Sequence, residues 1–434
     1  MRHICRRDFL TAAGLGVASL TLPFPKNWLK SAFAKEGVTP SMVILYLRGG
    51  MDAMNVVVPY TDSAYYEMRP TIAIPRPGDR GGALLDLDGS FGLHPALGAL
   101  KPFWDKGRLT PIVASGSPHP TRSHFDAQDF MEYAAPGTRT LRQGWVNRYL
   151  DISSRDEKGR AKEQAELRAL AMQGLLPRAL RGRYPVLAVP DRAVLADDGI
   201  MDLFGPLYEE EMEKAAGGGE MMHDRREDDP DDSVLATGRD TVATLNRFKA
   251  IMKDAESTRG GPAYPPGALG AKLRAVAHVI KSGEGLEVAA IDLGGWDTHA
   301  NQGGPEAGAL MSRLLSDLGD SIAAFMTDLG PALDRTLVVT MTEFGRTCRE
   351  NGNRGTDHGH GGLMFVAGGG VKGGKVLGDW HDLTEKSLYQ SRDLHVTTDF
   401  RDVFAAILTN HFRFKPPKDF FPDYKPAKVK NLFA

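Results

Sequence analysis

Five short runs of aliphatic and β-branched residues constrain the fold of this chain more than any other feature of its sequence. They are Met42–Leu47, Leu109–Ser115, Leu286–Leu293, Thr336–Thr342 and Leu363–Ala367. Each run is apolar at odd and even positions alike, which is typical of parallel strands covered by helices on both faces. Helical patterns lie between the runs, at Ala96–Lys106, Gly270–Lys281 and Ala307–Leu329. This alternation predicts an α/β fold with a doubly wound, mostly parallel central sheet and helices on both faces.

Acidic side chains follow the ends of three of these runs. Asp52 comes after two glycines that end the first run, Asp297 follows the third run, and Glu343 follows the fourth. Ligands of open α/β sheets bind outside the carboxyl ends of the strands, so we expect these side chains to lie at one site. Taken alone, Asp52 is more simply explained as the N-cap of the next helix, and Glu343 could pair with Arg346 on the surface.

The densest group of potential metal ligands lies in the segment 347–362. It places Asp357, His358 and His360 close together among glycines, which let the backbone crowd around a small charged centre. Asp297 and His299 are two positions apart, so on an extended segment both would face the same side. Carboxylate and imidazole groups suit zinc and similar divalent ions. The sequence therefore predicts one assembled metal site, with the ligand candidates Asp52, Asp297, His299, Glu343, Asp357, His358 and His360.

A candidate nucleophile follows the second apolar run. Ser123 lies at a predicted helix start, where the positive end of the helix dipole favours a bound anion. Beside a divalent ion its hydroxyl can lose its proton and attack phosphorus or sulfur. Arg122 and His124 could hold the anion, and so could Arg346. The alternative is that Ser123 is an ordinary N-cap, with Asp126 completing a pattern like a capping box.

The first 34 residues have the features of a targeting segment. A twin-arginine pair, Arg6-Arg7, is followed by an apolar run at 10–22 and by the small-x-small pattern of Ala32–Ala34. The apolar run is shorter than the roughly 20 residues that span a bilayer. We therefore expect residues 1–34 to be a twin-arginine signal peptide, with export of a mature domain, residues 35–434, to the periplasm or beyond. The alternative is an uncleaved N-terminal anchor.

Charge and cysteine content exclude several classes of protein. The net charge of the chain is −2, and removal of the basic signal leaves the mature protein at about −6, which excludes a basic nucleic-acid binder. No mature segment is apolar enough for a transmembrane helix. Cys348 is the one cysteine of the mature chain, and we interpret it as a buried structural thiol. The glycines of 368–373 fit a dinucleotide-binding pattern, but no helix is predicted behind them, so we reject a nucleotide cofactor.

Residues 151–240 differ from the rest of the chain in composition. Charge is dense at 154–168 and again at 223–232, and three glycines lie between these segments. We interpret the stretch as a charged helical insertion or cap with a solvated loop. The acidic run at 223–232 could bind calcium weakly, but a solvated loop is the simpler explanation.

Several short motifs together resemble a poorly characterised family, the secreted, twin-arginine-exported domain-of-unknown-function family fifteen-oh-one, placed in the alkaline phosphatase-like superfamily. The motifs are 49–55, 93–97, 123–125 with 128–129, 295–299, 343–347, 355–359 and 371–374, and they span essentially the whole mature chain. The superfamily resemblance implies a central sheet with two metal ions, usually zinc, manganese or calcium, held by Asp and His at strand ends. It also implies a Ser or Thr nucleophile and hydrolysis of phosphate or sulfate esters.

Carried over by motif, the resemblance makes Asp52 the first-strand ligand and Ser123 the nucleophile. The remaining ligands would be Asp297 with His299, and Asp357, His358 and His360. Three features depart from the superfamily pattern. The spacing of Asp297 and His299 is narrower than is usual for that ligand pair in the superfamily. Glu343-Phe344 stands where an Asp-His pair is common, and the sulfatase pattern is absent around Ser123, so a formylglycine sulfatase is not expected.

The sequence supports two hypotheses about function. The first is an exported metal-dependent hydrolase that acts on a small or polymeric phosphate or sulfate ester, with zinc as the first choice of metal. The second is a non-catalytic protein of the same fold, stabilised by its metal, that binds anionic polymers in the cell envelope. A redox protein is disfavoured because the chain has neither a cysteine motif nor a dinucleotide site.

Overall fold

The structure is a computed structural model that describes residues 39–433, except residues 80, 157, 163–164 and 166 and the segments 190–243 and 254–260. The predicted signal peptide and the acidic run at 223–232 lie outside the described residues. Among the described helices, none combines the length and the apolar character needed to cross a bilayer.

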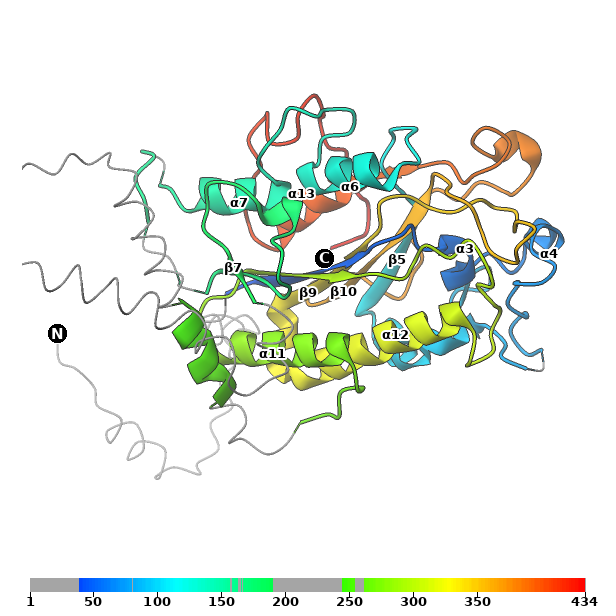
Figure 1. The fold of residues 1–434 in the computed structure, drawn as a ribbon, viewed down its shortest axis with the longest axis horizontal. Helices are drawn as coiled ribbons and strands as arrows, with labels where there is room; N and C mark the ends of the chain where they lie inside the picture. Colours follow the sequence, from blue (N-terminus) through cyan, green and yellow to red (C-terminus); the bar gives the residue numbers. More distant parts are fainter. Residues whose placement is uncertain are drawn as a thin grey trace, which may run out of the picture. The chain divides into compact units, whose positions relative to one another are not determined.

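An eight-stranded sheet forms the centre of the fold (Figure 1). Its strands are β1 (Ser41–Leu47), β5 (Leu109–Gly116), β6 (Ala169–Ala171), β7 (Leu187–Ala188), β8 (Val288–Leu293), β9 (Thr336–Met341), β10 (Gly362–Gly368) and β11 (Thr398–Asp399). Their order across the sheet is β11-β5-β10-β9-β1-β8-β6-β7. Strand β10 runs antiparallel to both neighbours, and the other pairs are parallel. The predicted mostly parallel α/β sheet is thus confirmed.

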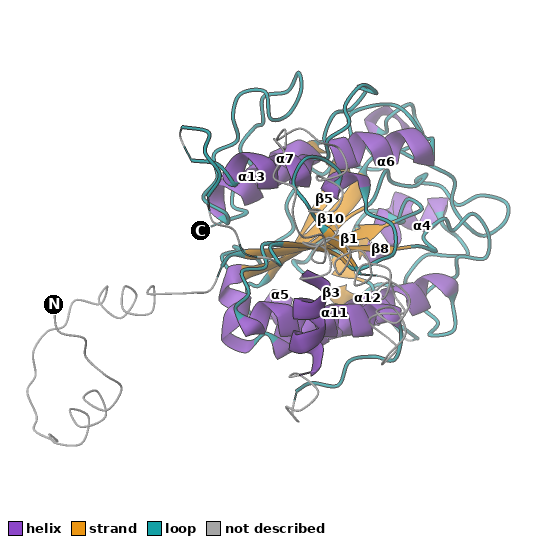
Figure 2. Ribbon diagram, turned by 60° about the vertical axis from the view of Figure 1, so that its left-hand side comes forward, coloured by secondary structure: helices purple, strands orange, loops and turns teal. Residues whose placement is uncertain are grey.

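Helices cover both faces of this sheet (Figures 1 and 2). One face carries α6 (His124–Tyr133), α7 (Trp145–Ser153) and α13 (Phe400–Asn410), and the other carries α5 (Lys101–Asp105), α11 (Ala268–Ser282) and α12 (Leu310–Asp328). The shorter helical elements are α3 (Ala53–Val56), α4 (Ser63–Met68), η1 (Pro95–Leu100), η2 (Arg178–Leu180), η3 (Gly330–Arg335), η4 (Glu385–Ser387) and residues 244–253. A small second sheet contains β2 (Val57–Val58), β4 (Gly92–Leu93) and β3 (Leu85–Asp86).

Strand β1 shows why its sequence run is apolar at every position. Successive side chains of a strand point to opposite faces of the sheet. Val43 and Leu45 therefore join the core that includes α11 and α12, whereas Ile44 and Tyr46 join the core that includes α7 and α13. Because both faces are covered, a polar residue at either kind of position would be buried without water.

The direction of β10 determines where the loop after β9 lies. Strand β9 ends at the carboxyl edge of the parallel strands, and β10 starts at that same edge because it runs the opposite way. The connecting loop, residues 342–361, therefore begins beside the carboxyl end of β1 and ends beside the carboxyl end of β5. All the predicted ligands of this segment are consequently held at the edge where ligands bind in open α/β sheets.

The described part of 151–240 does not form the predicted helical insertion. Helix α7 ends at Ser153, and β6 and β7 then extend the main sheet beyond β8. Arg168, just before β6, forms an ion pair at 2.6 Å with Glu287, just before β8, and so holds the two strand starts together. The apolar run of β6 is short and stands among charged residues, which concealed it in the sequence. Residues 190–240 of the predicted insertion lie outside the described residues.

The burial of β1 on both faces leads to a prediction about stability. Leu45 is 0% exposed, so Leu45→Ala leaves a cavity in the core and is expected to reduce the free energy of unfolding by about 2–5 kcal/mol. Leu175 is 80% exposed, and Leu175→Ala is expected to change it by less than about 0.5 kcal/mol. Urea unfolding of both variants measures the difference, and equal losses would contradict the fold.

Candidate metal centre

Three segments meet at the carboxyl edge of the sheet and carry most of the predicted ligands. Asp297 and His299 lie on the loop after β8, and His358 lies on the loop between β9 and β10. His124 is the first residue of α6, which follows β5. One ligand atom from each of His124, Asp297 and His358 lies within 4.8 Å of the others, so the three side chains could hold one metal ion.

Each of three imidazole rings is held through its Nδ1 atom. The pairs are His358 with the carbonyl oxygen of Arg122 (2.8 Å), His124 with the carboxylate of Glu343 (2.8 Å), and His299 with the carboxylate of Asp357 (3.2 Å). A carbonyl oxygen or an ionised carboxylate only accepts hydrogen bonds, so each Nδ1 carries the proton. In the neutral ring, each Nε2 then keeps its lone pair free to bind an ion.

The three Nε2 atoms converge on the carboxylate of Asp297. The Nε2 atom of His358 lies 2.9 Å from that of His299 and 3.1 Å from Asp297 Oδ1, and His299 Nε2 lies 3.0 Å from the same oxygen. The Nε2 atom of His124 is buried 3.5 Å from Asp297 Oδ2 and has no hydrogen-bond partner among the described residues.

These facing lone pairs explain why the site suits a cation. Lone pairs that point at one another repel unless a proton or a cation lies between them. Nitrogen ligands about 2.0–2.1 Å from a tetrahedral zinc ion are about 3.3 Å apart. The distance of 2.9 Å between the Nε2 atoms of His358 and His299, and those of 3.0–3.5 Å from each Nε2 atom to the Asp297 carboxylate, are close to that value. The donor set of imidazole nitrogens and one carboxylate therefore fits a divalent metal ion, zinc first.

The protonation states of Asp297, Asp357 and His358 agree with metal ligation at neutral pH. Burial raises the pKa of Asp297, but the guanidinium of Arg346, 2.6 Å away, outweighs it and holds this pKa below its usual value. Burial lowers the pKa of His358, although Asp297 opposes the shift. A hydrogen bond from Asn351 lowers the pKa of Asp357. The carboxylates are thus ionised and His358 is neutral, as metal ligands must be.

Glu343 was predicted as a ligand, but the structure places its carboxylate on the Nδ1 side of His124, a candidate ligand. Its buried carboxylate accepts hydrogen bonds from His124, Gln128 and the backbone N–H of Gly49, at 2.8, 2.9 and 2.9 Å. Burial alone raises the pKa of Glu343, but these donors outweigh it and hold the pKa below its usual value. A carboxylate on the far nitrogen of a ligating imidazole fixes the ring and increases its basicity.

Arg346 was predicted to hold an anion, but its guanidinium is buried and engaged with protein acceptors. They are the carbonyl oxygens of Gly49, Gly50 (2.5 Å), Trp296 (3.0 Å) and Thr356 (2.9 Å) and the carboxylate of Asp297 (2.6 Å). These acceptors come from the loops after β1, β8 and β9. Arg346 therefore positions Asp297 and the loops around it.

Asp52, the predicted first-strand ligand, forms a buried ion pair. Arg69 binds both of its oxygens, at 2.5 and 2.9 Å, and Gln302 donates to one of them at 2.6 Å. The Asp52 side chain does not cap α3 either. Arg69 also donates to the carbonyl of Cys348. Cys348 is buried, as predicted, and burial raises the pKa of its thiol to about 12.

His360 is separated from the other predicted ligands by its packing. Its ring stacks on Tyr389 with centroids 4.2 Å apart. Burial, reinforced by the charge of Arg122, lowers the pKa of His360 to about 4. It does not belong to the group of possible metal ligands found among the described residues.

Ser123 lies beside the cluster in the chain and is exposed. It stands between Arg122, whose carbonyl holds His358, and the ring of His124. Ser123 occupies the N-cap position of α6, but its side chain makes no capping hydrogen bond. Asp126 pairs with an exposed arginine instead of completing a capping box. The hydroxyl of Ser123 is thus not used as a cap.

Arg122 was also predicted to hold an anion. Its guanidinium contacts Asp393 at 2.5 Å and Gln390 at 2.9 Å. The side chain is partly exposed. In this conformation Arg122 contributes its carbonyl oxygen to His358, and its positive charge is already paired.

His124 is a candidate ligand that the sequence did not reveal, since we expected it to hold an anion. A signal existed in the motif 123–125, where a histidine opens a helix directly after a strand. Its role depends on Glu343, which lies far away in the sequence and contacts it only in the folded chain. The contact between His124 and Glu343 cannot be predicted from the sequence unless the order of the strands in the sheet is known.

Comparisons with known proteins give one family and several remote structural neighbours. A family described as "Protein of unknown function (DUF1501)" matches residues 249–419. No protein with a curated description matches the sequence.

Several solved structures are remotely similar to this chain. Lipoteichoic acid synthase LtaP from Listeria monocytogenes has 8% identity and a TM-score of 0.36, over 91% of this chain and 76% of that chain. PsFucS1 sulfatase from Pseudoalteromonas sp. has 12% identity and a TM-score of 0.35, over 92% and 75%. The C-terminal periplasmic domain of EcEptC from Escherichia coli, in complex with Zn, has 12% identity and a TM-score of 0.31, over 76% and 73%. A function must therefore be argued from the site itself.

The bond between His124 and Glu343 predicts how metal affinity depends on pH. That hydrogen bond raises the pKa of His124, and below this pKa the ring is protonated on both nitrogens and cannot ligate. We expect zinc affinity to fall by about tenfold per pH unit for each proton released on binding. Glu343→Gln removes the charge that raises the pKa, so the fall should begin at lower pH, with about 10–100-fold weaker binding at pH 8. Competition with a chelator between pH 5 and 8 measures both effects, and an unchanged profile in Glu343→Gln would contradict the pairing.

The contacts of Arg346 predict a large loss of stability when its planar fork is removed. Arg346→Lys keeps the charge but leaves several buried carbonyl oxygens without donors, so the free energy of unfolding should fall by at least about 2 kcal/mol. Arg349 lies on the same loop and is exposed, so Arg349→Lys should change it by less than about 0.5 kcal/mol. Urea unfolding of the two variants measures these changes in free energy. Similar losses in both would show that Arg346 does not hold the loops.

Proposed function

We propose that this protein is an exported metal-dependent hydrolase of phosphate or sulfate esters. One observation carries the proposal: three imidazole Nε2 atoms converge on the carboxylate of Asp297, while each Nδ1 is held by its own acceptor. A cluster of this kind has little value as packing, because uncompensated lone pairs in a partly buried site are costly. In metal sites, the second nitrogen of each ligating imidazole is commonly held by a hydrogen-bond acceptor. The three rings of this cluster have the same arrangement.

The ion would be held by His124, Asp297 and His358, with His299 as a further ligand. When bound, a divalent ion polarises the ester oxygen and lowers the pKa of a hydroxyl or water beside it. Glu343 keeps the Nδ1 proton of His124 in place, and the carbonyl of Arg122 does the same for His358.

Ser123 is the proposed nucleophile. Its exposed hydroxyl stands at the start of α6, where backbone N–H groups and the helix dipole favour an anionic group. Because the side chain of Ser123 does not cap the helix, the first-turn N–H groups stay available to an ester anion. Attack by the serine oxygen on phosphorus or sulfur breaks the bond to the leaving alcohol, and water then releases the enzyme-bound anion.

A second candidate function is favoured by the contacts of Asp52. Its two oxygens are taken by Arg69 and Gln302, and Glu343 is occupied by His124 and Gln128. Asp52 and Glu343, two of the predicted ligands, thus hold other side chains in place. The remaining candidate ligands are enough for one ion. A non-catalytic protein of the cell envelope that is stabilised by one metal ion would need no more than this.

The proposed location is the periplasm or the exterior, through the twin-arginine machinery. Residues 1–34 support it by the arginine pair, the short apolar run and the small residues before position 35. Export after folding would allow the metal to be bound before the protein leaves the cytoplasm.

Metal analysis by mass spectrometry is the first test. We expect protein purified without added metal to contain at least one equivalent of a divalent ion, zinc first. The double variant His124→Ala/His358→Ala should lose it, because two of the converging Nε2 atoms are removed. His381→Ala, at an exposed histidine outside the cluster, should keep it. A parent protein without metal would overturn the proposal.

Ester hydrolysis then separates the two candidate functions. We expect the metal-loaded parent to hydrolyse nitrophenyl phosphate or sulfate, and Ser123→Ala to lose at least about a hundredfold in kcat while it keeps the ion. If the protein holds the metal, hydrolyses no ester and loses thermal stability on chelation, the non-catalytic candidate is correct.

A further inference from the structure

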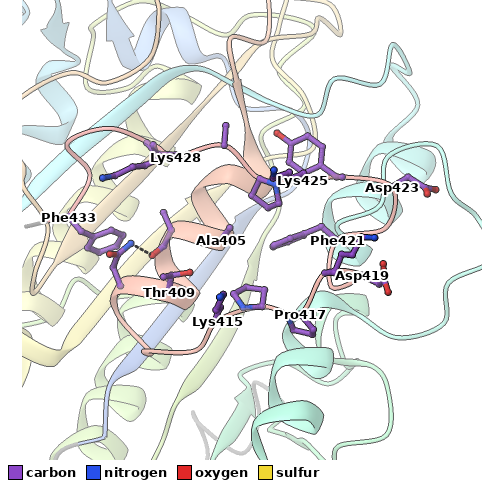
Figure 3. Close-up of a pocket in the computed structure, with 18 of the residues that line it drawn as sticks. Ala405, Thr409, Lys415, Pro417, Asp419, Phe421, Asp423, Lys425, Lys428 and Phe433 are labelled. Carbon is purple, nitrogen blue, oxygen red and sulfur yellow. Dashed lines mark hydrogen bonds between the residues drawn. The ribbon is translucent and has the colours of Figure 1, made fainter.

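A large hollow lies between the C-terminal segment and α13, and it shares no residue with the candidate metal centre (Figure 3). Its volume of about 1340 Å³ exceeds the roughly 300–1,000 Å³ of most small-molecule sites. The C-terminal half of α13 forms its floor, and residues 415–433 form its walls. Five lysines line this basic hollow: Lys372, Lys415, Lys418, Lys425 and Lys428.

The charge of the hollow opposes the charge of the protein. The chain is acidic overall, yet the lining holds these five lysines against two acids, Asp419 and Asp423. Figure 3 shows the two aspartates at one end, beside Phe421. None of the five lysines forms an ion pair within the described part of the chain. Their charges are therefore free to meet an anionic ligand.

The walls of the hollow are anchored to the domain. The backbone N–H of Lys372 donates to Leu432 at 2.9 Å, which ties the end of the chain to the glycine-rich turn after β10. Further along, Tyr424 and the backbone N–H of Ala427 donate to the same oxygen of Asp402, at 2.8 and 2.7 Å. A cavity whose walls are already fixed loses little entropy when a ligand binds.

The glycine-rich turn has a role here that its sequence did not reveal. Residues 368–373 fit a dinucleotide-binding pattern, but no helix follows within 369–384. The turn instead presents Lys372 to the hollow. The turn thereby adds one positive charge to the lining.

We propose that the basic hollow binds an anionic glycan, a chain of sugar units that carry sulfate, phosphate or carboxylate groups. Lysine ammonium groups suit several anionic groups without fixing one geometry. Pro417 and the partly buried ring of Phe433 offer flat apolar surfaces against which sugar rings can pack. A volume above that of single small molecules suits several sugar units.

Two other anionic partners fit the hollow less well. Binding to an anionic bilayer requires exposed apolar side chains beside the basic ones, but the exposed large hydrophobic residues, Phe125, Ile152 and Leu175, do not line the hollow. Single-stranded nucleic acids stack successive bases on several accessible aromatic rings. Phe421 is 2% exposed and the ring of Tyr424 is covered by Arg401, which leaves the partly buried ring of Phe433 among the aromatic residues of the lining. A glycan needs neither exposed apolar side chains for a bilayer nor a series of rings for stacked bases.

The test compares dextran sulfate with neutral dextran of the same size, which differ only in their anionic groups. We expect the mature protein to bind dextran sulfate and not dextran, and to bind it more weakly as salt is raised from 50 to 300 mM. Lys415→Gln/Lys418→Gln/Lys425→Gln/Lys428→Gln should weaken binding at least tenfold. The control Lys106→Gln/Lys158→Gln/Lys253→Gln/Lys386→Gln changes four exposed lysines elsewhere and should stay within twofold of the parent.

Each other result overturns the proposal. Absence of binding by the parent, or equal weakening in the two lysine variants, would show that the hollow is not a glycan site. Tighter binding to phosphatidylglycerol vesicles or to a thymidine oligonucleotide would assign a different partner. Thermal unfolding shows whether both lysine variants remain folded. His124→Ala/His358→Ala should bind dextran sulfate as the parent does, so this test stands or fails separately from the proposed hydrolase.

Discussion

Arg346 brings a full positive charge to a place that water does not reach, and the candidate site depends on how that charge is compensated. A buried guanidinium is tolerated only when acceptors surround it. Here the acceptors come from three loops that are distant in sequence, including the carbonyls of Gly50 and Thr356 and the carboxylate of Asp297. The same contacts that satisfy Arg346 therefore fix the position of Asp297, on which the three imidazole rings converge.

A second buried interaction, the ion pair of Arg69 with Asp52, holds two of the same loops together. Arg69 joins Asp52, after β1, to the backbone around Cys348 on the loop between β9 and β10. Neither this pair nor Arg346 contacts a substrate directly in our proposal. Together they explain why a site formed on loops can keep its geometry, because each loop is fastened by charge-assisted hydrogen bonds as well as by its strand ends.

The sequence was sufficient for five of the eight strands of the main sheet, β1, β5, β8, β9 and β10, and for the edge at which the candidate site lies. Runs such as Met42–Leu47 are apolar on both faces because both faces are covered, and that pattern survives without any tertiary information. The clusters at Asp297 and His358 could be found because metal ligands follow strand ends. The short strands β6 and β7 were missed because runs of two or three residues have no detectable period.

The roles within the site were harder to predict than its location. Whether a buried carboxylate is a ligand or a support depends on its neighbours in space, and Glu343 and Asp52 each meet a partner that only the fold supplies. His360 shows the reverse case, since two positions after His358 its ring turns to Tyr389. The spacing of residues in the sequence predicts which side of a segment each residue faces. It does not predict which side chains of other segments lie opposite that residue.

The position of β1 at the centre of the sheet has a consequence for synthesis of the protein. Met42 pairs with Val288 on one side and with Leu337 on the other, so the first strand to leave the ribosome waits for partners that are made much later. Until β8 and β9 have emerged, both hydrogen-bonding edges of β1 lack their native partners and are open to wrong pairing. The candidate metal cluster uses residues that lie on both sides of this strand in the sheet, the last of them His358. It can therefore form only after β8, β9 and the loop that follows β9 have been made.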